Sequence, residues 1–180
     1  MSVKLGIAPI AWSNDDMPEL GGDTPLEQCL SEASEAGFSG IESGGKFPKK
    51  SKELIPLLEK YNLNLCSGWY GANLRKNSVK EEISKIQEQL KLFQDCKAPC
   101  IVFAEVSDSI AGDPDKSLSS RPQMDKEGWN EFCKKISEIF LQKSFHSSLF
   151  ICGLLDKGFL GSPAIEFETS ASTMHGALQS

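Results

Sequence analysis

Polar and aromatic residues follow four apolar segments of this 180-residue chain and could bind or transform a small polar ligand. They occupy residues 12–16, 42–46, 66–70 and 105–108. Two of them, Glu42 and Glu105, are carboxylates at the ends of predicted strands in apolar surroundings, where a charge is costly unless it is paired or used. Such a group can transfer protons or bind hydroxyl groups. Position alone leaves a structural pair and a catalytic role equally open.

Four other residues of these clusters are candidates for contact with a polyhydroxylated ring. Asn14 can both accept and donate hydrogen bonds, as vicinal hydroxyls require, and we favour this role over its alternative, an Asx turn after the strand. Trp12 and Trp69 offer flat apolar walls, although a tryptophan at a strand end is as often part of the core. Lys46 follows two glycines, and its ammonium either polarises a ketone or is simply solvated.

Composition limits what such a site can serve. The formal net charge is −6, 39% of the residues are hydrophobic, and no block of basic residues is present. This balance argues against nucleic acid and anionic membranes as partners and favours a small polar ligand. The first residues match neither a secretory signal nor a membrane span, so we expect a cytoplasmic protein.

Cysteine and histidine spacing predicts no metal site. The six cysteines fall in apolar segments without a CxxC pair, and we expect them to be reduced, buried core thiols; they are Cys29, Cys66, Cys96, Cys100, Cys133 and Cys152. The two histidines, His146 and His175, have no neighbouring ligands that would form a metal site with them.

Strand and helix signals alternate four times along the chain. The predicted strands begin at Leu5 and then cover residues 40–43, 63–68 and 100–106, and the first surfaces at Trp12. We expect helices that start with a cap at Thr24, at Ser51 with Pro56 in the first turn, at a Ser78–Glu81 capping box and at a cap on Asp125. Gly37 and Asn62 are expected to end the first two helices. A further strand or short helix is expected at residues 149–155.

This alternation predicts a parallel α/β sheet, because each crossover helix returns the chain to the same edge. An open doubly wound sheet and part of an eight-unit barrel both fit that pattern. No GxGxxG or GxxxxGK[ST] sequence follows the first strand, so we favour the barrel. In a barrel, Asn14, Glu42 and Glu105 would face one cavity at the carboxyl ends of the strands.

Several motifs at matching spacing closely resemble the myo-inosose-2 dehydratase family of xylose-isomerase-like TIM barrels. They are residues 5–16, 18–25, 36–42, 44–48 and 102–108, with Arg121 and Pro122. The likeness covers residues 3–139 and therefore the N-terminal half of a barrel, since a complete one takes about 250 residues. It implies an α/β partial barrel of about four βα units over residues 1–140, after which residues 141–180 form a divergent segment. We expect that segment to be partly disordered, because from Gly161 the chain is small and polar with little periodicity.

The resemblance also implies an activity. Members of the family are lyases of inositol breakdown that eliminate water from 2-keto-myo-inositol with a divalent metal, manganese or cobalt. It favours Glu42 and Glu105 as catalytic or hydroxyl-binding residues, with Trp12, Asn14, Lys46 and Trp69 contacting the substrate. No metal ligands are recognisable, so we expect this chain alone to be inactive.

Two other roles remain open at this stage. The chain could be a sugar isomerase or epimerase of the same superfamily, or a non-catalytic fragment that binds ligand or an intact subunit. An unclosed half-barrel also leaves strand edges without partners, which predicts self-association.

Overall fold

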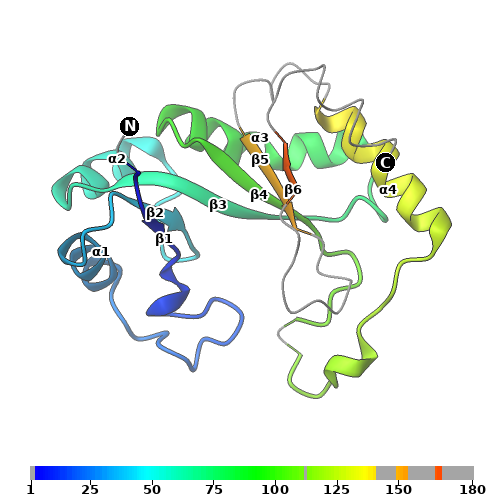
Figure 1. The fold of residues 1–180 in the computed structure, drawn as a ribbon, viewed down its shortest axis with the longest axis horizontal. Helices are drawn as coiled ribbons and strands as arrows, with labels where there is room; N and C mark the ends of the chain where they lie inside the picture. Colours follow the sequence, from blue (N-terminus) through cyan, green and yellow to red (C-terminus); the bar gives the residue numbers. More distant parts are fainter. Residues whose placement is uncertain (1–2, 112, 141–148, 154–164, 168–180) are drawn as a thin grey trace. The chain divides into compact units, whose positions relative to one another are not determined.

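Strands and helices alternate along the residues that the structure, a computed structural model, describes: 3–111, 113–140, 149–153 and 165–167 (Figure 1). The chain divides into two compact units. The first unit comprises residues 1–69 and 88–99, and the second comprises residues 70–87 and 100–180. Strand β3 (Asn64–Ala72) and helix α3 (Val79–Asp95) each run from one unit into the other.

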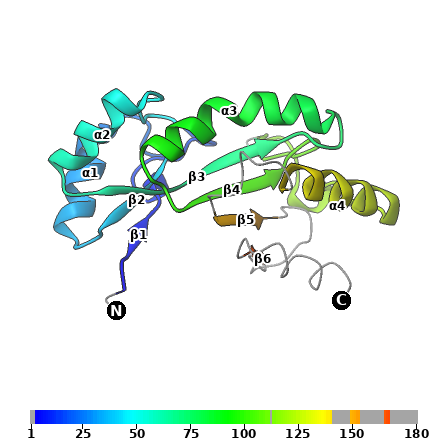
Figure 2. The same ribbon diagram turned by 90° about the horizontal axis from the view of Figure 1, so that it is seen from above.

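The first unit contains a parallel arrangement of β1, β2 and the start of β3. Its elements are β1 (Gly6–Ile7), the 3-10 helix η1 (Pro9–Ala11), α1 (Leu26–Glu35), β2 (Gly40–Ser43) and α2 (Ser51–Lys60). Strand β2 pairs in parallel with β1 on one side and with β3 on the other, and Figure 2 shows the three strands side by side. The predicted βαβα order is therefore confirmed for this unit.

The second unit continues the alternation. It holds β4 (Cys100–Glu105), the 3-10 helix η2 (Leu118–Ser120), α4 (Lys126–Phe140), β5 (Leu149–Gly153) and β6 (Ile165–Phe167). Strand β5 pairs in parallel with β4, which confirms a fifth strand, and β6 pairs antiparallel with β5. The remainder of the segment predicted to be divergent and partly disordered lies outside the described residues, as do His146 and His175.

Two strand lengths differ from expectation. Strand β1 stops at Ile7 because Pro9 has no N–H for a strand ladder and instead starts η1, where the N–H groups of Trp12 and Ser13 both bind the Pro9 carbonyl. Strand β3 extends to Ala72, four residues past the predicted end at Gly68. A Cβ on Gly68 would lie 2.4 Å from the Phe93 ring, so this glycine admits the ring of α3 against the strand.

Helix starts were predicted with mixed success. The Ser78–Glu81 capping box is confirmed, with reciprocal bonds at 2.7 and 3.3 Å, and Asp125 caps α4 by accepting the Gly128 N–H at 2.8 Å. Thr24 is not a cap, because its hydroxyl donates to the Trp12 carbonyl and Pro25 occupies the N-cap position of α1. Pro56 lies in the interior of α2, beyond the first turn where we expected it.

The helices α1, α2 and α3 all end in the same backbone motif. In each, the N–H of the residue in the left-handed region donates to the carbonyl of the second-last helical residue. The N–H of the following residue donates to the carbonyl of the third-last helical residue, and all six distances are 2.9–3.1 Å. The left-handed residues are Gly37, Asn62 and Lys97, so two of the three helix ends carry a Cβ in a conformation that disfavours one.

Buried apolar side chains line one face of each helix, as the periodicity predicted. Helix α3 buries Ile86, Leu90 and Phe93, but the position one turn before Ile86 is Glu82, whose exposure is only 1%. None of Cys29, Cys66, Cys96, Cys100 and Cys133 is in a disulfide, but only Cys29 is buried as we expected of all of them. The helices in the described part of the chain lack the length and apolar character of a membrane span.

We predict that Lys97→Gly stabilises the protein by about 1 kcal/mol, because Lys97 has a φ of 55° and glycine removes the steric cost of that conformation. The matched control, Glu88→Gly on the exposed face of α3, should lose about 1 kcal/mol. Urea unfolding followed by circular dichroism measures both. Equal destabilisation by the two glycines would contradict the assignment.

Candidate functional site

The structure places the six predicted site residues in two groups. The first unit holds Trp12, Asn14, Glu42, Lys46 and Trp69, and the second unit holds Glu105. The prediction that Asn14, Glu42 and Glu105 face one cavity stays a prediction.

Glu42 is a half-buried carboxylate near the end of β2. Its Oε2 accepts the Ser67 hydroxyl at 2.6 Å, and the register of β2 and β3 sets Glu42 directly opposite Ser67. Burial raises the pKa of the neighbouring Cys66 thiol, and the charge of Glu42 adds to this rise. Glu42 Oε1 accepts no hydrogen bond from the described residues. The carboxylate is therefore held through one oxygen, and the other remains available for a proton or a hydroxyl group.

Charged side chains join the loop after β1 to the loop after β2. Asp15 Oδ2 accepts the Gly45 N–H at 2.7 Å, and a Cβ on Gly45 would lie 2.9 Å from Asp15 Oδ1. Lys46 donates from Nζ to the carbonyls of Gly21, at 3.3 Å, and Thr24, at 2.5 Å. Lys46 thus binds backbone carbonyls rather than standing solvated, and Asp15 is a loop-fixing residue that the sequence reasoning missed.

The remaining candidates of this unit have local partners. Asn14 Oδ1 accepts the N–H groups of Asp16 and Met17, at 2.9 and 3.1 Å, which is the Asx turn considered as its alternative. The Trp12 indole N–H donates to Glu32 at 2.5 Å and, with a smaller effect of Gln28, lowers the pKa of that carboxyl.

Trp69 lies in the interior of β3 and not at its end. Its side chain is 44% exposed, so it is not the core residue that the alternative described. Its backbone carbonyl accepts the Gln89 amide at 2.9 Å. An exposed indole of this kind offers an apolar face to a ligand or a partner.

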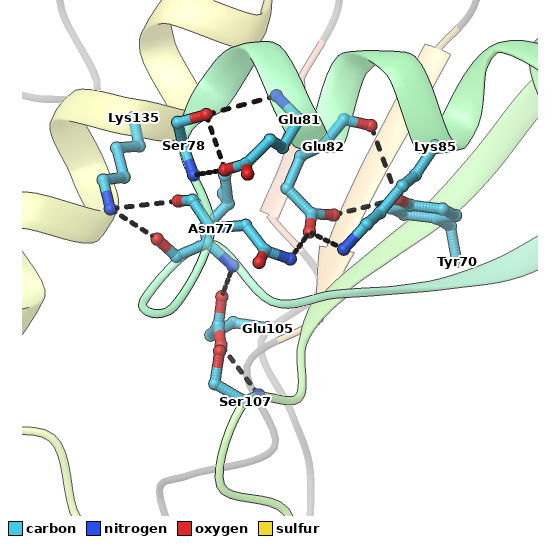
Figure 3. A network of polar contacts seen from close by, with 10 residues as sticks. Tyr70, Asn77, Ser78, Glu81, Glu82, Lys85, Glu105, Ser107 and Lys135 are labelled. Atoms are coloured by element: carbon cyan, nitrogen blue, oxygen red, sulfur yellow. Dashed lines mark hydrogen bonds and ion pairs between the residues drawn. The ribbon is translucent and has the colours of Figure 1, made fainter.

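Glu105, the last residue of β4, is fixed through both carboxylate oxygens (Figure 3). Oε2 accepts the Leu74 N–H at 2.7 Å, and Oε1 accepts the Ser107 N–H at 2.8 Å. The predicted strand-end position is confirmed. Its role differs from a free base, because the carboxylate connects the loop after β3 with the loop after β4.

Basic residues that the sequence analysis did not single out lie on the same two loops. Arg75 and Lys76 both pair with Asp108, the latter at 3.1 Å, and Lys76 also donates to the Ser107 carbonyl. The hydrogen bond from Lys76, together with the charges of Lys76 and Arg75, lowers the pKa of Asp108. Both basic residues are visible in the sequence, but the ion pair spans more than thirty positions and has no local signal.

A shallow hollow of about 790 Å³ adjoins this ion pair in the second unit. Its border includes Lys76, Ser107, Asp108, Lys116, Ser117 and Ser120. The Ser107 hydroxyl is buried and lacks a hydrogen-bond partner among the described residues. The two lysines have carboxylate partners, Asp108 for Lys76 and Asp113 for Lys116, so the lining is polar without a single dominant charge.

Among the described residues of the second unit, Glu82 on α3 is the charged side chain with the least exposure, 1%. It accepts the Tyr70 hydroxyl at 2.9 Å and the Asn77 amide, and it pairs with Lys85 at 3.7 Å (Figure 3). Burial, followed by this hydrogen bond, raises the pKa of Tyr70. The only sequence signal was an acidic residue on the apolar stripe of the helix, and we missed it.

The donor set for an implied metal does not fit within the described part of the chain. There, no group of three or more His, Cys, Asp or Glu residues could hold an ion. Metal coordination therefore enters no step that we derive for these residues.

Comparison with characterised sequences gives three informative relatives. The chain is 42% identical over 139 residues to rhizopine catabolism protein MocC of Rhizobium meliloti, which is 77% of this chain and 43% of that protein. It is 40% identical over 131 residues to inosose dehydratase of Bacillus thuringiensis (72% and 44%) and 36% identical over 152 residues to that of Mesomycoplasma hyopneumoniae (81% and 50%). The chain spans about half the length of these relatives, and no protein-family model matches it.

Solved structures show the fold. An AP endonuclease of family 2 from Brucella melitensis has a TM-score of 0.56 and 12% identity, covering 83% of this chain and 55% of that one. Mannonate dehydratase from Streptococcus suis has a TM-score of 0.55 and 13% identity, covering 92% and 58%. The predicted fold class, α/β with the parallel strands of a partial TIM barrel, is thereby confirmed.

We predict that Lys76→Met raises the pKa of Asp108 toward its ordinary value of about 3.9. The pKa of Asp108 is lower in the folded than in the unfolded protein. The Lys76–Asp108 contact therefore stabilises the fold at pH values above the unfolded-state pKa, and this stabilisation is lost as the pH falls through the folded-state pKa. Carbon-13 NMR titration of the Asp108 carboxyl measures the shift. Lys116→Met, which removes the partner of Asp113, is the control and should leave Asp108 unchanged.

Proposed function

We propose that this chain, which is homologous over most of its length to the inosose dehydratases and to MocC, supplies part of a dehydratase site that eliminates water from 2-keto-myo-inositol. The identity of 40% over 131 residues to a protein named inosose dehydratase carries this proposal. The aligned region covers 43% and 44% of two of those relatives, so in our proposal turnover also needs residues equivalent to the part that this chain does not cover.

Dehydration beside a ketone begins with removal of a proton from the α carbon, and it is completed when the neighbouring C–O bond breaks and the hydroxyl group, protonated by an acid, leaves as water. Glu42 is the better base of the two candidate carboxylates, because its Oε1 takes no hydrogen bond from the described residues while Ser67 orients Oε2 at 2.6 Å. A positioned base of this kind contributes a rate factor of about 10² to 10⁴. In this proposal Ser67 fixes the carboxylate so that a single oxygen meets the substrate.

Glu105 suits a different task. Both of its oxygens already accept backbone N–H groups, which hold the carboxylate rigidly and leave lone pairs for hydroxyl groups of a polyol. We assign it as a hydroxyl-binding or proton-transfer group. Rigid placement by hydrogen bonds is what a binding carboxylate requires.

The proposed substrate contacts of the remaining candidates use ring faces and N–H donors that the contacts described above do not occupy. Trp12 and Trp69 can present ring faces to the C–H face of a polyol. Asn14 retains its amide NH₂ as a donor, since Oδ1 serves the turn. The Lys46 ammonium, bound to two carbonyls, keeps one N–H for a ketone or hydroxyl oxygen.

The resemblance implies a divalent ion, manganese or cobalt, which when bound would supply Lewis-acid stabilisation of negative charge on a substrate oxygen. The described residues do not supply its ligands, and we propose that these belong to the part of the site equivalent to the relatives' other half. We further propose that the protein is cytoplasmic and acts on a small polyol. Its net charge of −6 argues against nucleic acid and membrane partners. We also propose that it can self-associate through unpaired strand edges.

A chimera tests the proposal. Residues 1–139 of this chain, joined to the unaligned C-terminal part of the Bacillus thuringiensis enzyme, should convert 2-keto-myo-inositol to the dehydrated dione with manganese or cobalt present, whereas the 180-residue chain alone should not. Glu42→Gln in the chimera should lower kcat by about 10² to 10⁴. Chromatographic detection of the dione measures both.

Glu88→Gln on the exposed face of α3 is the matched control and should leave the rate unchanged. Dione formation by the 180-residue chain alone would contradict the need for further residues. A folded chimera that leaves the ketoinositol intact and isomerises a ketohexose would replace the dehydratase with a sugar isomerase.

A further inference from the structure

Leu74, in the loop between β3 and α3, is held by charged side chains on both sides of its backbone. Its N–H donates to Glu105 Oε2 at 2.7 Å, and its carbonyl accepts Lys135 Nζ at 2.6 Å (Figure 3). The Leu74 side chain is fully buried, which anchors the same residue from a third direction. This arrangement joins β4 and α4 of the second unit through one loop residue.

The Lys135 ammonium has an acceptor for each of its three protons. Besides the Leu74 carbonyl it meets the Asn77 carbonyl at 3.2 Å and Glu131 at 2.7 Å on its own helix. Its side chain is only 21% exposed, and the adjacent residue Ile136 is buried, so the lysine stem runs beside the core. A solvated surface lysine would show neither feature.

Other contacts restrain the same loop, residues 73–78. The Asn77 side chain donates to buried Glu82, and Lys76 donates to the Ser107 carbonyl. Among the described residues, only Lys135 binds the carbonyl of Leu74, the residue whose N–H donates to Glu105. The loop is thus restrained at several points, and Lys135 is the restraint placed to control the Glu105 contact.

We infer that Lys135 is a positioning residue for Glu105, acting through Leu74. By holding the carbonyls of Leu74 and Asn77, it keeps the Leu74 N–H aimed at Oε2 and so fixes the direction of the carboxylate. The functional part of this inference rests on the proposed role of Glu105. The positioning itself rests on the contacts alone.

Lys135→Met tests the inference, because it keeps the stem and removes the three N–H donors. Amide hydrogen exchange of Leu74, followed by NMR in the 180-residue chain, should accelerate by about tenfold or more, since its local restraint is lost. The amide of Ser107, held by the other oxygen of Glu105, serves as the internal reference and should change less. Lys134→Met, an exposed neighbour, is the matched control, and Lys135→Arg should restore most of the protection.

In the dehydratase chimera, Lys135→Met should lower kcat severalfold with little change in KM, because the carboxylate is misdirected while the substrate still binds. Unchanged Leu74 exchange in Lys135→Met would overturn the inference whatever the activity. Faster exchange with an unchanged kcat would overturn the positioning role for catalysis. An inactive parent chimera would count against the proposed function alone, and the exchange result would still decide whether Lys135 restrains the Leu74 backbone. If Lys135→Met does not fold, Lys135→Gln carries the same expectations.

Discussion

The loops that follow parallel strands carry backbone N–H and C=O groups that no neighbouring strand can satisfy, and in this protein charged side chains satisfy them. Asp15 and Lys46 do so in the first unit, for Gly45 and for the carbonyls of Gly21 and Thr24. Glu105 and Lys135 do so in the second. Bonds between an ionised side chain and the backbone are stronger than neutral ones, so they can order loops whose N–H and C=O groups no strand pairs.

This constraint explains why strand-end residue types are an ambiguous signal of function. A carboxylate after an apolar run is what a catalytic site requires, and it is also what a loop with two unsatisfied N–H groups requires. Sequence reasoning correctly placed Glu105 at the end of β4, yet no local feature of the sequence indicates its partner Leu74, which is 31 positions away. The Lys135 contacts are harder still, because the lysine and Leu74 are 61 positions apart and helical periodicity marks residue 135 only as a neighbour of core positions.

The fold was more predictable than the site because its signals are local. The Ser78–Glu81 capping box, the Asp125 cap and the turn after Gly37 each depend on residues within one helical turn, and each is confirmed. Strand β1 was mispredicted because the local signal of Pro9 was overlooked, whereas other errors fall where tertiary contacts overrule local signals. Strand β3 passes through Gly68 because the Phe93 ring needs the space that a side chain would fill, and β3 ends only at Ala72, whose carbonyl accepts the Val106 N–H.

Counting the hydrogen-bond capacity that remains on each candidate separates roles that residue type alone cannot. A carboxylate offers about four lone-pair sites, so Glu105 keeps roughly half of them after binding two N–H groups, and Glu42 keeps more. The side-chain carbonyl oxygen of Asn14 already accepts two N–H groups of the turn, so Asn14 can act toward a ligand as a donor only. A residue can therefore order its loop and bind a substrate at the same time, provided that some of its lone pairs or N–H groups make no hydrogen bond within the loop. On that criterion, of the two candidate carboxylates, Glu42 is the better suited to the proton transfer that we propose, and Glu105 is the better suited to hold a hydroxyl group in place.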